Sequence, residues 1–219
     1  MTDTADLTLA EVRERLGPLL ASNAAFDGWN RAALDISADG AGIDRDVAAL
    51  AFPRGGVDMI EAWFAATDRR MLTQHGPETL AAMKVRERIT ALVWGRIEAV
   101  AGEREALRRA LAVLALPQNL PRAARLWWHA ADAMWNAAGD RSTDYNWYSK
   151  RLTLGGVYAS TIAVLLDDDS EGLADTRAFL DRRIDDVMRF EKAKARWTGK
   201  DRDGFSMTRF LGRLRYPAV

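Results

Sequence analysis

The sequence predicts an all-α fold for this chain of 219 residues. Apolar residues recur at the three- and four-residue spacing of helices along nearly the whole chain. No stretch alternates between polar and apolar residues for long enough to indicate a β-sheet. Glycine and proline divide the chain into segments of helical length, and a hydrophobic content of 48% suffices to fill a core.

The first predicted element is a short helix that starts at a capping box. Thr8 and Glu11 have the spacing at which their side chains satisfy the free amides of a first turn. Gly17-Pro18 is expected to interrupt this helix, because proline suits the first turn of a new helix and lacks the amide proton that an interior position needs.

Two more short helices follow. Asn30 is a favoured N-cap residue, and the helix it starts is expected to end at Gly40. A turn then leads to a helix near residues 44–50, which the turn of residues 52–56 closes. Longer helices are expected at about 57–72, 78–101, 103–115, 121–138, 144–166 and 171–196, with a last short one at 204–215.

This order of short helices before long ones resembles TetR-type repressors, in which a helix-turn-helix precedes a ligand-binding helical body. The resemblance divides the chain into an N-terminal helix-turn-helix-like bundle (1–56), a larger helical body (57–198) and an amphipathic tail (199–219). A recognition helix needs exposed cations for phosphates and base edges. The candidate here offers Asp44, Arg45 and Asp46, whose charges nearly cancel, so we expect a structural remnant that binds no nucleic acid.

Composition restricts the other classes of function. Lys and Arg total 31 and Asp and Glu also total 31, so no net field attracts nucleic acid or an anionic membrane. The chain has no cysteine, which excludes disulfides and thiolate metal sites. Its first residues lack the apolar core of a signal peptide, and no apolar run is long enough to span a bilayer. Membrane contact is therefore expected only at the surface.

Residues for catalysis are scarce, and we predict neither an enzyme nor a cofactor or metal site. The only histidines, His75 and His129, belong to no metal-binding pair. His129 and Asp132 share a helical face, as an acid–base couple or, more commonly, as an orienting contact. The run Asp167–Asp169 is expected to be a solvated helix boundary, with metal binding as the alternative.

An aromatic segment stands out near the predicted helix 121–138. Trp127 and Met134 lie seven residues apart, as do Trp128 and Trp135, so each pair shares a stripe along the helix. The next helix has no charge from residue 152 to 166 and is therefore expected to be buried nearly all round. Gly155-Gly156 removes bulk in its middle, either for a closely packed neighbouring helix or for a ligand.

The sequence around this region resembles the coenzyme Q (ubiquinone) biosynthesis family of TetR-like lipid-binding accessory proteins. The resemblance covers roughly residues 10–195. Its most specific motif is Gly139-Asp140-Arg141-Ser142-Thr143-Asp144-Tyr145-Asn146-Trp147-Tyr148, supported by Leu116-Pro117-Gln118-Asn119, Asp132-Ala133-Met134-Trp135 and Phe179-Leu180-Asp181-Arg182-Arg183-Ile184.

The resemblance implies a homodimer that binds an isoprenoid quinone precursor in its helical body and presents it to a membrane-associated ring hydroxylase. The hydroxylase-binding surface of the family corresponds to Asp132, Met134, Trp147 and Tyr148, with core packing as the rival reading for each. The lipid is expected to contact apolar and aromatic residues of the body, namely Trp94, Leu111, Leu114, Trp127, Trp128, Ala131, Trp135, Leu154, Tyr158, Ile162 and Leu165. A TetR-type regulator that responds to an apolar ligand is the alternative function.

The tail departs from the family, whose amphipathic tail is longer. If residues 205–215 are helical, they form an apolar stripe flanked by arginines that can lie in a membrane interface or pack on the body. We expect membrane binding by Met207, Arg209, Phe210, Leu211, Arg213 and Leu214. The absence of a transit peptide favours a cytoplasmic protein associated peripherally with the inner membrane.

Overall fold

The computed structural model describes residues 7–140 and 145–200, with side chains described for residues 7–140 and 147–189. Every regular element in these ranges is helical, so the predicted fold class is confirmed. The chain forms two compact units, Met1–Leu180 and Asp181–Val219, and all sites discussed below belong to the first. The predicted tail helix at 204–215 lies outside the described residues, and the predicted boundary at residue 56 falls inside the first unit and stays a prediction.

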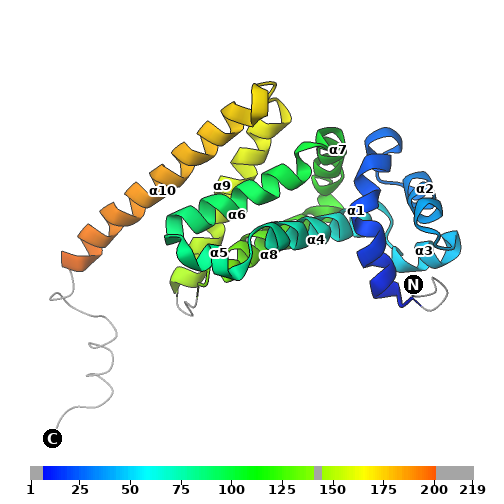
Figure 1. Ribbon diagram of the computed structural model, residues 1–219, viewed down its shortest axis with the longest axis horizontal. Helices are drawn as coiled ribbons and strands as arrows, with labels where there is room; N and C mark the ends of the chain where they lie inside the picture. The colour runs from blue at the N-terminus through cyan, green and yellow to red at the C-terminus, as the bar shows by residue number, and fades with distance from the viewer. Residues whose placement is uncertain (1–6, 141–144, 201–219) are drawn as a thin grey trace, which may run out of the picture. The chain divides into compact units, whose positions relative to one another are not determined.

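The N-terminal bundle consists of α1 (Leu9–Asp27), α2 (Arg31–Ala41) and α3 (Arg45–Ala51), which pack on one another (Figure 1). The capping box is present, since the Thr8 amide donates to Glu11 Oε2 at 2.8 Å and the Glu11 amide to Thr8 Oγ1 at 3.3 Å. Asn30 caps α2 as predicted. The helix ends one residue beyond Gly40, because Gly42 adopts the left-handed conformation at φ 67° that closes it.

Pro18 does not interrupt α1, and this prediction was wrong. A proline inside a helix leaves the carbonyl four residues before it without its intrahelical partner. That carbonyl belongs to Glu14, and Arg69 of α4 donates to it at 3.2 Å. Gly17 lets the two helices approach closely there, since a Cβ atom at this position would lie 2.7 Å from the Ala62 carbonyl oxygen. Tertiary contacts with α4 thus keep α1 continuous.

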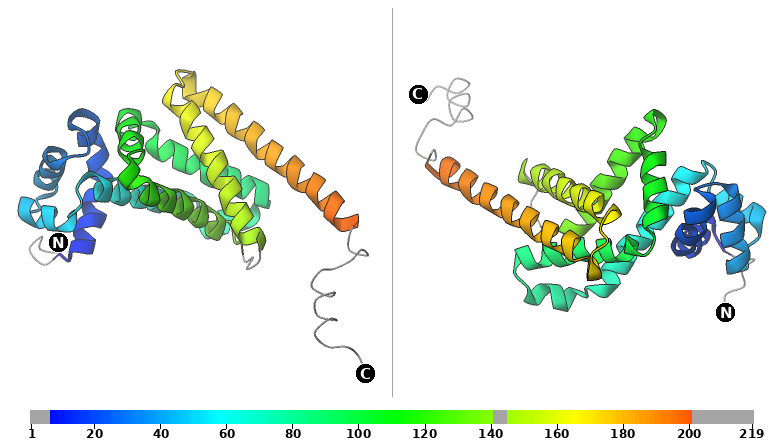
Figure 2. Two further views of the ribbon diagram at one scale, coloured as in Figure 1. Left: turned by 180° about the vertical axis from the view of Figure 1, so that it is seen from behind. Right: turned by 90° about the horizontal axis from the view of Figure 1, so that it is seen from above.

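The helical body comprises α4 (Gly56–Gln74), α5 (Pro77–Ala82), α6 (Val85–Ala101), α7 (Arg104–Leu114), α8 (Leu120–Ala137), α9 (Tyr145–Leu166) and the start of α10 (Ala174–Lys200). The single helix predicted at 78–101 is divided in two, because Met83 is extended and Glu87 accepts a hydrogen bond from the Lys84 amide at 2.9 Å. Helices α8 and α9 pack against each other, and the N-terminal bundle lies at one end of the first unit in both views of Figure 2.

The bundle and the body share one hydrophobic core. Helix α1 packs along α4, and Trp29 reaches past α4 to donate its indole N–H to the Ala106 carbonyl of α7 at 3.0 Å. The Trp29 and Trp63 rings lie 5.3 Å apart. Because side chains from the bundle and from the body fill this core together, the two parts belong to one compact unit.

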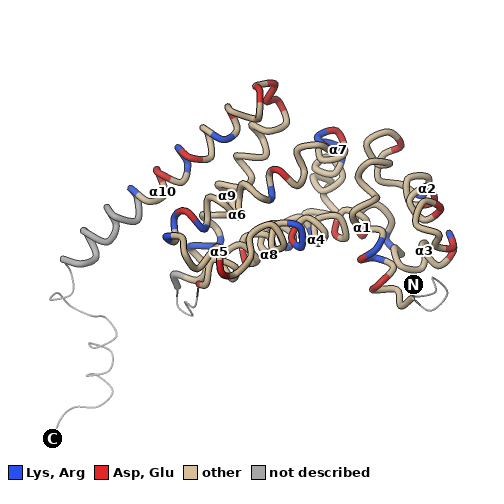
Figure 3. Tube along the Cα trace, viewed as in Figure 1, with Lys and Arg blue, Asp and Glu red and all other residues tan. Residues whose placement is uncertain are grey.

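Helix α9 is not buried nearly all round, contrary to the prediction. Leu154, Tyr158 and Leu165 face the core, but Leu152 is 67% exposed and Gly156 is exposed as well. A Cβ atom at Gly155 or Gly156 would have no neighbour within 4 Å. Figure 3 shows α9 without charge beyond its first turns, so its outer face is both uncharged and exposed.

Candidate functional site

An aromatic cluster joins α8 to the start of α9. The ring centroid of Trp128 lies 5.3 Å from that of Trp147 and 6.0 Å from that of Tyr148, and the Trp147 and Tyr148 centroids are 4.7 Å apart. Further along the same helices, Trp127 meets Tyr158 edge-on at 5.4 Å. The sequence predicted aromatic stripes on both helices, and the structure brings them into contact.

Arg151 organises the polar side of this cluster, although it was not among the site residues predicted from the sequence. Its side chain is 1% exposed, and its guanidinium carbon lies 4.0 Å from the Trp147 ring centroid. It pairs with Asp132 at 2.6 Å and with Asp140 at 3.2 Å, and it also donates to the Trp147 carbonyl. A buried cation needs such partners, and these contacts hold Trp147 in place. The available signal was an arginine one turn after Trp147, directly before the uncharged stretch 152–166.

Lys150 reinforces the same junction from the neighbouring position. Its ammonium pairs with Asp140 at 2.8 Å and lies 5.3 Å from the Trp135 ring centroid. The Trp135 indole donates to the Lys150 carbonyl at 3.0 Å. The end of α8 and the start of α9 are therefore fixed to each other by paired charges stacked on aromatic rings.

The residues predicted to bind a partner differ sharply in exposure. Tyr148 is 57% exposed, while Trp147 and Asp132 are half-buried, and Asp132 pairs with Arg151 rather than with His129. Met134 is fully buried, which agrees with the core-packing alternative for this residue and not with an exposed partner-binding position. It faces the core because its stripe on α8 continues from the buried Ala130 and Ala131.

The residues predicted to bind lipid all lie in the helical body. Leu114, Ala131, Leu154, Tyr158, Ile162 and Leu165 are buried, whereas Trp94, Leu111, Trp127, Trp128 and Trp135 are half-buried. Trp94 also lines an open groove of about 700 Å³ between α4, α6 and the turn before α10. Arg70, Gln74 and Glu98 contribute to that groove, so its wall is more polar than a lipid pocket was expected to be.

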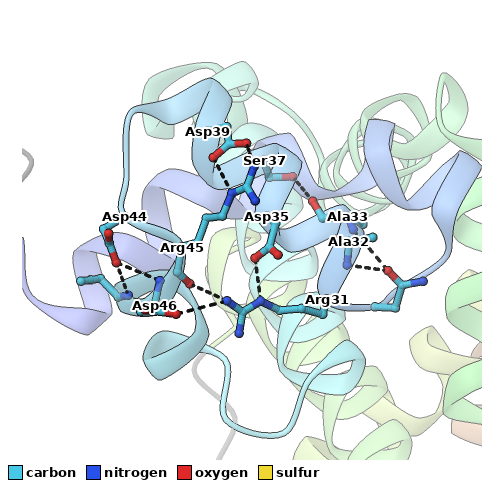
Figure 4. Close-up of polar contacts among 11 residues, drawn as sticks. Arg31, Ala32, Ala33, Asp35, Ser37, Asp39, Asp44, Arg45 and Asp46 are labelled. Carbon is cyan, nitrogen blue, oxygen red and sulfur yellow. Dashed lines mark hydrogen bonds and ion pairs between the residues drawn. The ribbon is translucent and has the colours of Figure 1, made fainter.

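The candidate recognition surface carries arginines that are already paired, as Figure 4 shows. Arg31 contacts Asp35 at 2.6 Å and Asp46 at 3.5 Å, and Arg45 contacts Asp39 at 2.5 Å. The hydrogen bonds that Arg31 donates to Asp35 and Arg45 donates to Asp39 raise the pKa of both arginines. A nucleic-acid phosphate would have to compete with the aspartate in each of these ion pairs. This is a second argument against nucleic-acid binding, beside the balanced charge of the candidate recognition helix.

Asp168 is a buried capping residue and not the solvated one that was predicted. It is 3% exposed, and its carboxylate accepts hydrogen bonds from the amides of Ser170 and Thr176, both at 2.8 Å, and from both hydroxyls. These bonds, led by the Ser170 and Thr176 side chains, hold the pKa of Asp168 well below its ordinary value. Arg104 donates to its carbonyl, which ties α7 to this turn.

Two further features bear on the classes of function. Among the described residues, no group of three or more histidine, aspartate and glutamate side chains is arranged to hold a metal ion. In the same part of the chain, no helix is long and apolar enough to cross a membrane.

Comparisons with known proteins confirm the family resemblance. Residues 120–191, which include α8 and α9, match the COQ9 family model. The chain is 49% identical over 80 residues to the mitochondrial ubiquinone biosynthesis protein COQ9 of Rattus norvegicus, which is 36% of this chain and 26% of that protein. It is 28% identical over 168 residues to the protein of the same name from Drosophila melanogaster, covering 75% of this chain and 51% of the relative. The chain thus spans between about a quarter and half of these relatives' length.

The fold comparison agrees with the predicted architecture. The crystal structure of a TetR transcriptional regulator from Nitrosomonas europaea ATCC 19718 superposes with a TM-score of 0.63, at 24% sequence identity. The match covers 80% of this chain and 96% of that structure. The chain therefore has a TetR-like all-α fold.

Proposed function

We propose that this chain, whose residues 120–191 match the COQ9 family, is a non-catalytic accessory protein of ubiquinone biosynthesis. In this proposal it binds an isoprenoid quinone precursor in its helical body and presents it to a ring hydroxylase at a membrane surface. The relatives that sequence comparison finds are named ubiquinone biosynthesis proteins.

The observation that carries the proposal is the position of the family match on the structure. The matched segment contains α8 and α9, and therefore the aromatic cluster that Arg151 holds together. Tyr148 of that cluster is 57% exposed, beside a buried cation and two carboxylates that fix its surroundings. An exposed aromatic on a rigid base is the kind of residue that dominates the binding energy of protein interfaces.

The uncharged outer face of α9 supports a homodimer as part of this proposal. Tyr148, Leu152 and Gly156 are exposed there, and the open space at Gly155 and Gly156 would let a second helix approach closely. An exposed apolar stripe of this kind is costly in water unless a partner covers it.

The lipid proposal is tested by extracting the purified chain with organic solvent and identifying bound molecules by mass spectrometry. An isoprenoid phenol or quinone, present in a fixed ratio to the protein, is the expected result. The variant Leu154→Asp, which places a charge at a buried position of α9, is expected to lose the bound lipid. Protein that is folded and carries no lipid after mild purification would contradict the proposal.

A TetR-type regulator remains the second candidate, since the three-helix N-terminal bundle is retained and the fold is TetR-like. The pairing of Arg31 and Arg45 with aspartates opposes it. Gel shifts with a library of genomic fragments at moderate salt distinguish the two, and sequence-selective binding would establish the regulator.

A further inference from the structure

A charged residue and a tyrosine lie inside the helical body, away from the aromatic cluster. Arg96 of α6 is 1% exposed and Tyr158 of α9 is 2% exposed. The guanidinium carbon of Arg96 lies 5.0 Å from the Tyr158 ring centroid. Asp68 of α4 pairs with Arg96 Nη1, so three helices each contribute one polar side chain to this point.

The surroundings of this group are apolar. On α6, Leu92, Val93 and Val100 lie one turn from Arg96 and are fully buried. On α9, Leu154 and Ile162 flank Tyr158 and are 3% and 2% exposed. Trp127 of α8, which is half-buried, meets the Tyr158 ring edge-on. Water therefore has little access to the polar atoms of this group. Trp127, which contacts Tyr158 and is partly exposed, lies between the group and the surface of α8.

Several of these polar atoms have no hydrogen-bond partner. The Tyr158 hydroxyl and Arg96 Nε are buried and unsatisfied among the described residues, and Arg96 Nη1 and Asp68 Oδ1 form an ion pair but make no hydrogen bond either. A hydroxyl or an N–H group left in this state costs folding free energy, and buried polar groups in proteins are nearly always paired. Apolar packing alone would be served better by phenylalanine at position 158. The hydroxyl therefore points to a partner that the described residues do not supply.

We propose that Arg96 and Tyr158 bind an oxygen atom on the aromatic ring of the lipid, and so fix the orientation of its head group inside the body. This inference rests on the proposed function. Arg96 Nε can only donate, and the Tyr158 hydroxyl can donate or accept, so a quinone carbonyl or a phenolic oxygen satisfies both. Asp68 offsets the guanidinium charge, which favours a neutral oxygen over a carboxylate or phosphate. The isoprenoid tail would then lie against the apolar residues around the pair.

The test compares two radiolabelled probes by rapid gel filtration: a ubiquinone with a two-unit isoprenoid tail, and squalene, which is isoprenoid but has no oxygen. Tyr158→Phe is expected to weaken quinone binding about 3- to 10-fold, the loss expected for one hydrogen bond. Squalene binding should change by less than about 2-fold, because the burial of apolar surface is retained. The melting temperature should stay the same or rise, since the removed hydroxyl has no hydrogen-bond partner among the residues that the structure describes.

Thr161→Val is the matched control. Thr161 is also a buried hydroxyl of α9, but it already donates to the Val157 carbonyl at 2.7 Å, so quinone affinity should not change. Unchanged quinone binding in Tyr158→Phe, or an equal loss of both probes, would overturn the inference. Wild-type protein that binds squalene but not the quinone would also overturn it and leave lipid binding intact. Wild-type protein that binds neither probe would overturn the proposed function itself.

Discussion

Replacing Asp58 with alanine should destabilise the chain strongly, because this carboxylate is 0% exposed and joins three parts of the fold. It accepts hydrogen bonds from the amide of Arg54 at 2.9 Å and from Arg54 Nε at 3.0 Å. Arg122 of α8 contacts it at 3.4 Å and Arg13 of α1 at 3.9 Å. Removing the Asp58 carboxylate would leave three arginines close together without the negative charge that they share.

The size of the effect follows from the partners that remain. Removing one member of a buried ion pair costs about 3–5 kcal/mol. Glu61 still contacts Arg13 at 3.6 Å and Arg122 at 3.3 Å, so we expect the lower end, about 3 kcal/mol. For a chain of this size that corresponds to a fall of about 6–12 °C in melting temperature.

Thermal unfolding followed by circular dichroism measures this fall. Asp46→Ala is the control, because the Asp46 side chain is 96% exposed and its contact with Arg31 is a surface pair, so the melting temperature should move by roughly 2 °C or less. A similarly small change for Asp58→Ala would refute the reasoning that this ion network holds α1, α4 and α8 together.

Other consequences can be tested in the same way. Tyr148→Ala should leave the melting temperature nearly unchanged, because the side chain is 57% exposed, while ubiquinone production in cells falls; a loss of many degrees would show that the residue is core. Asp168→Asn should lower stability at pH 7, and its difference from wild type should shrink below about pH 4. The pKa of Asp168 is lowered by folding, so its contribution is present above the ordinary value of 3.8 and is lost as pH falls toward the folded pKa. Sedimentation at micromolar concentration should show a dimer that Leu152→Glu converts to monomer, and only monomer in the wild type would count against the dimer. Liposomes with anionic lipid should bind the full chain more tightly than a version ending at Trp197, and equal binding would show that the tail packs on the body.

Local signals in the sequence predicted those parts of the fold that depend on neighbours within one helical turn. The caps at Thr8 and Asn30 formed as expected, because each side chain satisfies backbone amides two or three residues away. Most helix boundaries and the fold class were also predicted from the sequence. The motif that ends in Trp147-Tyr148 also indicated the family that the comparisons match.

The tertiary structure decided the features whose partners are distant in the chain. Pro18 remains inside α1 because Arg69 serves the carbonyl that the proline leaves free, a compensation that no local pattern contains. Asp168 is buried because Thr176, eight residues away, turns back to bind it.

The candidate site shows the same division. Its aromatic residues were visible in the sequence, but Met134 turned out to be buried and Tyr148 exposed, since exposure depends on which face of a helix meets its neighbours. Arg151 and Arg96 were not selected because an arginine in a sequence normally indicates a solvated position. Only the packing of α8 against α9, and of α6 against α4 and α9, supplies the carboxylates and aromatic rings that allow these two cations to be buried.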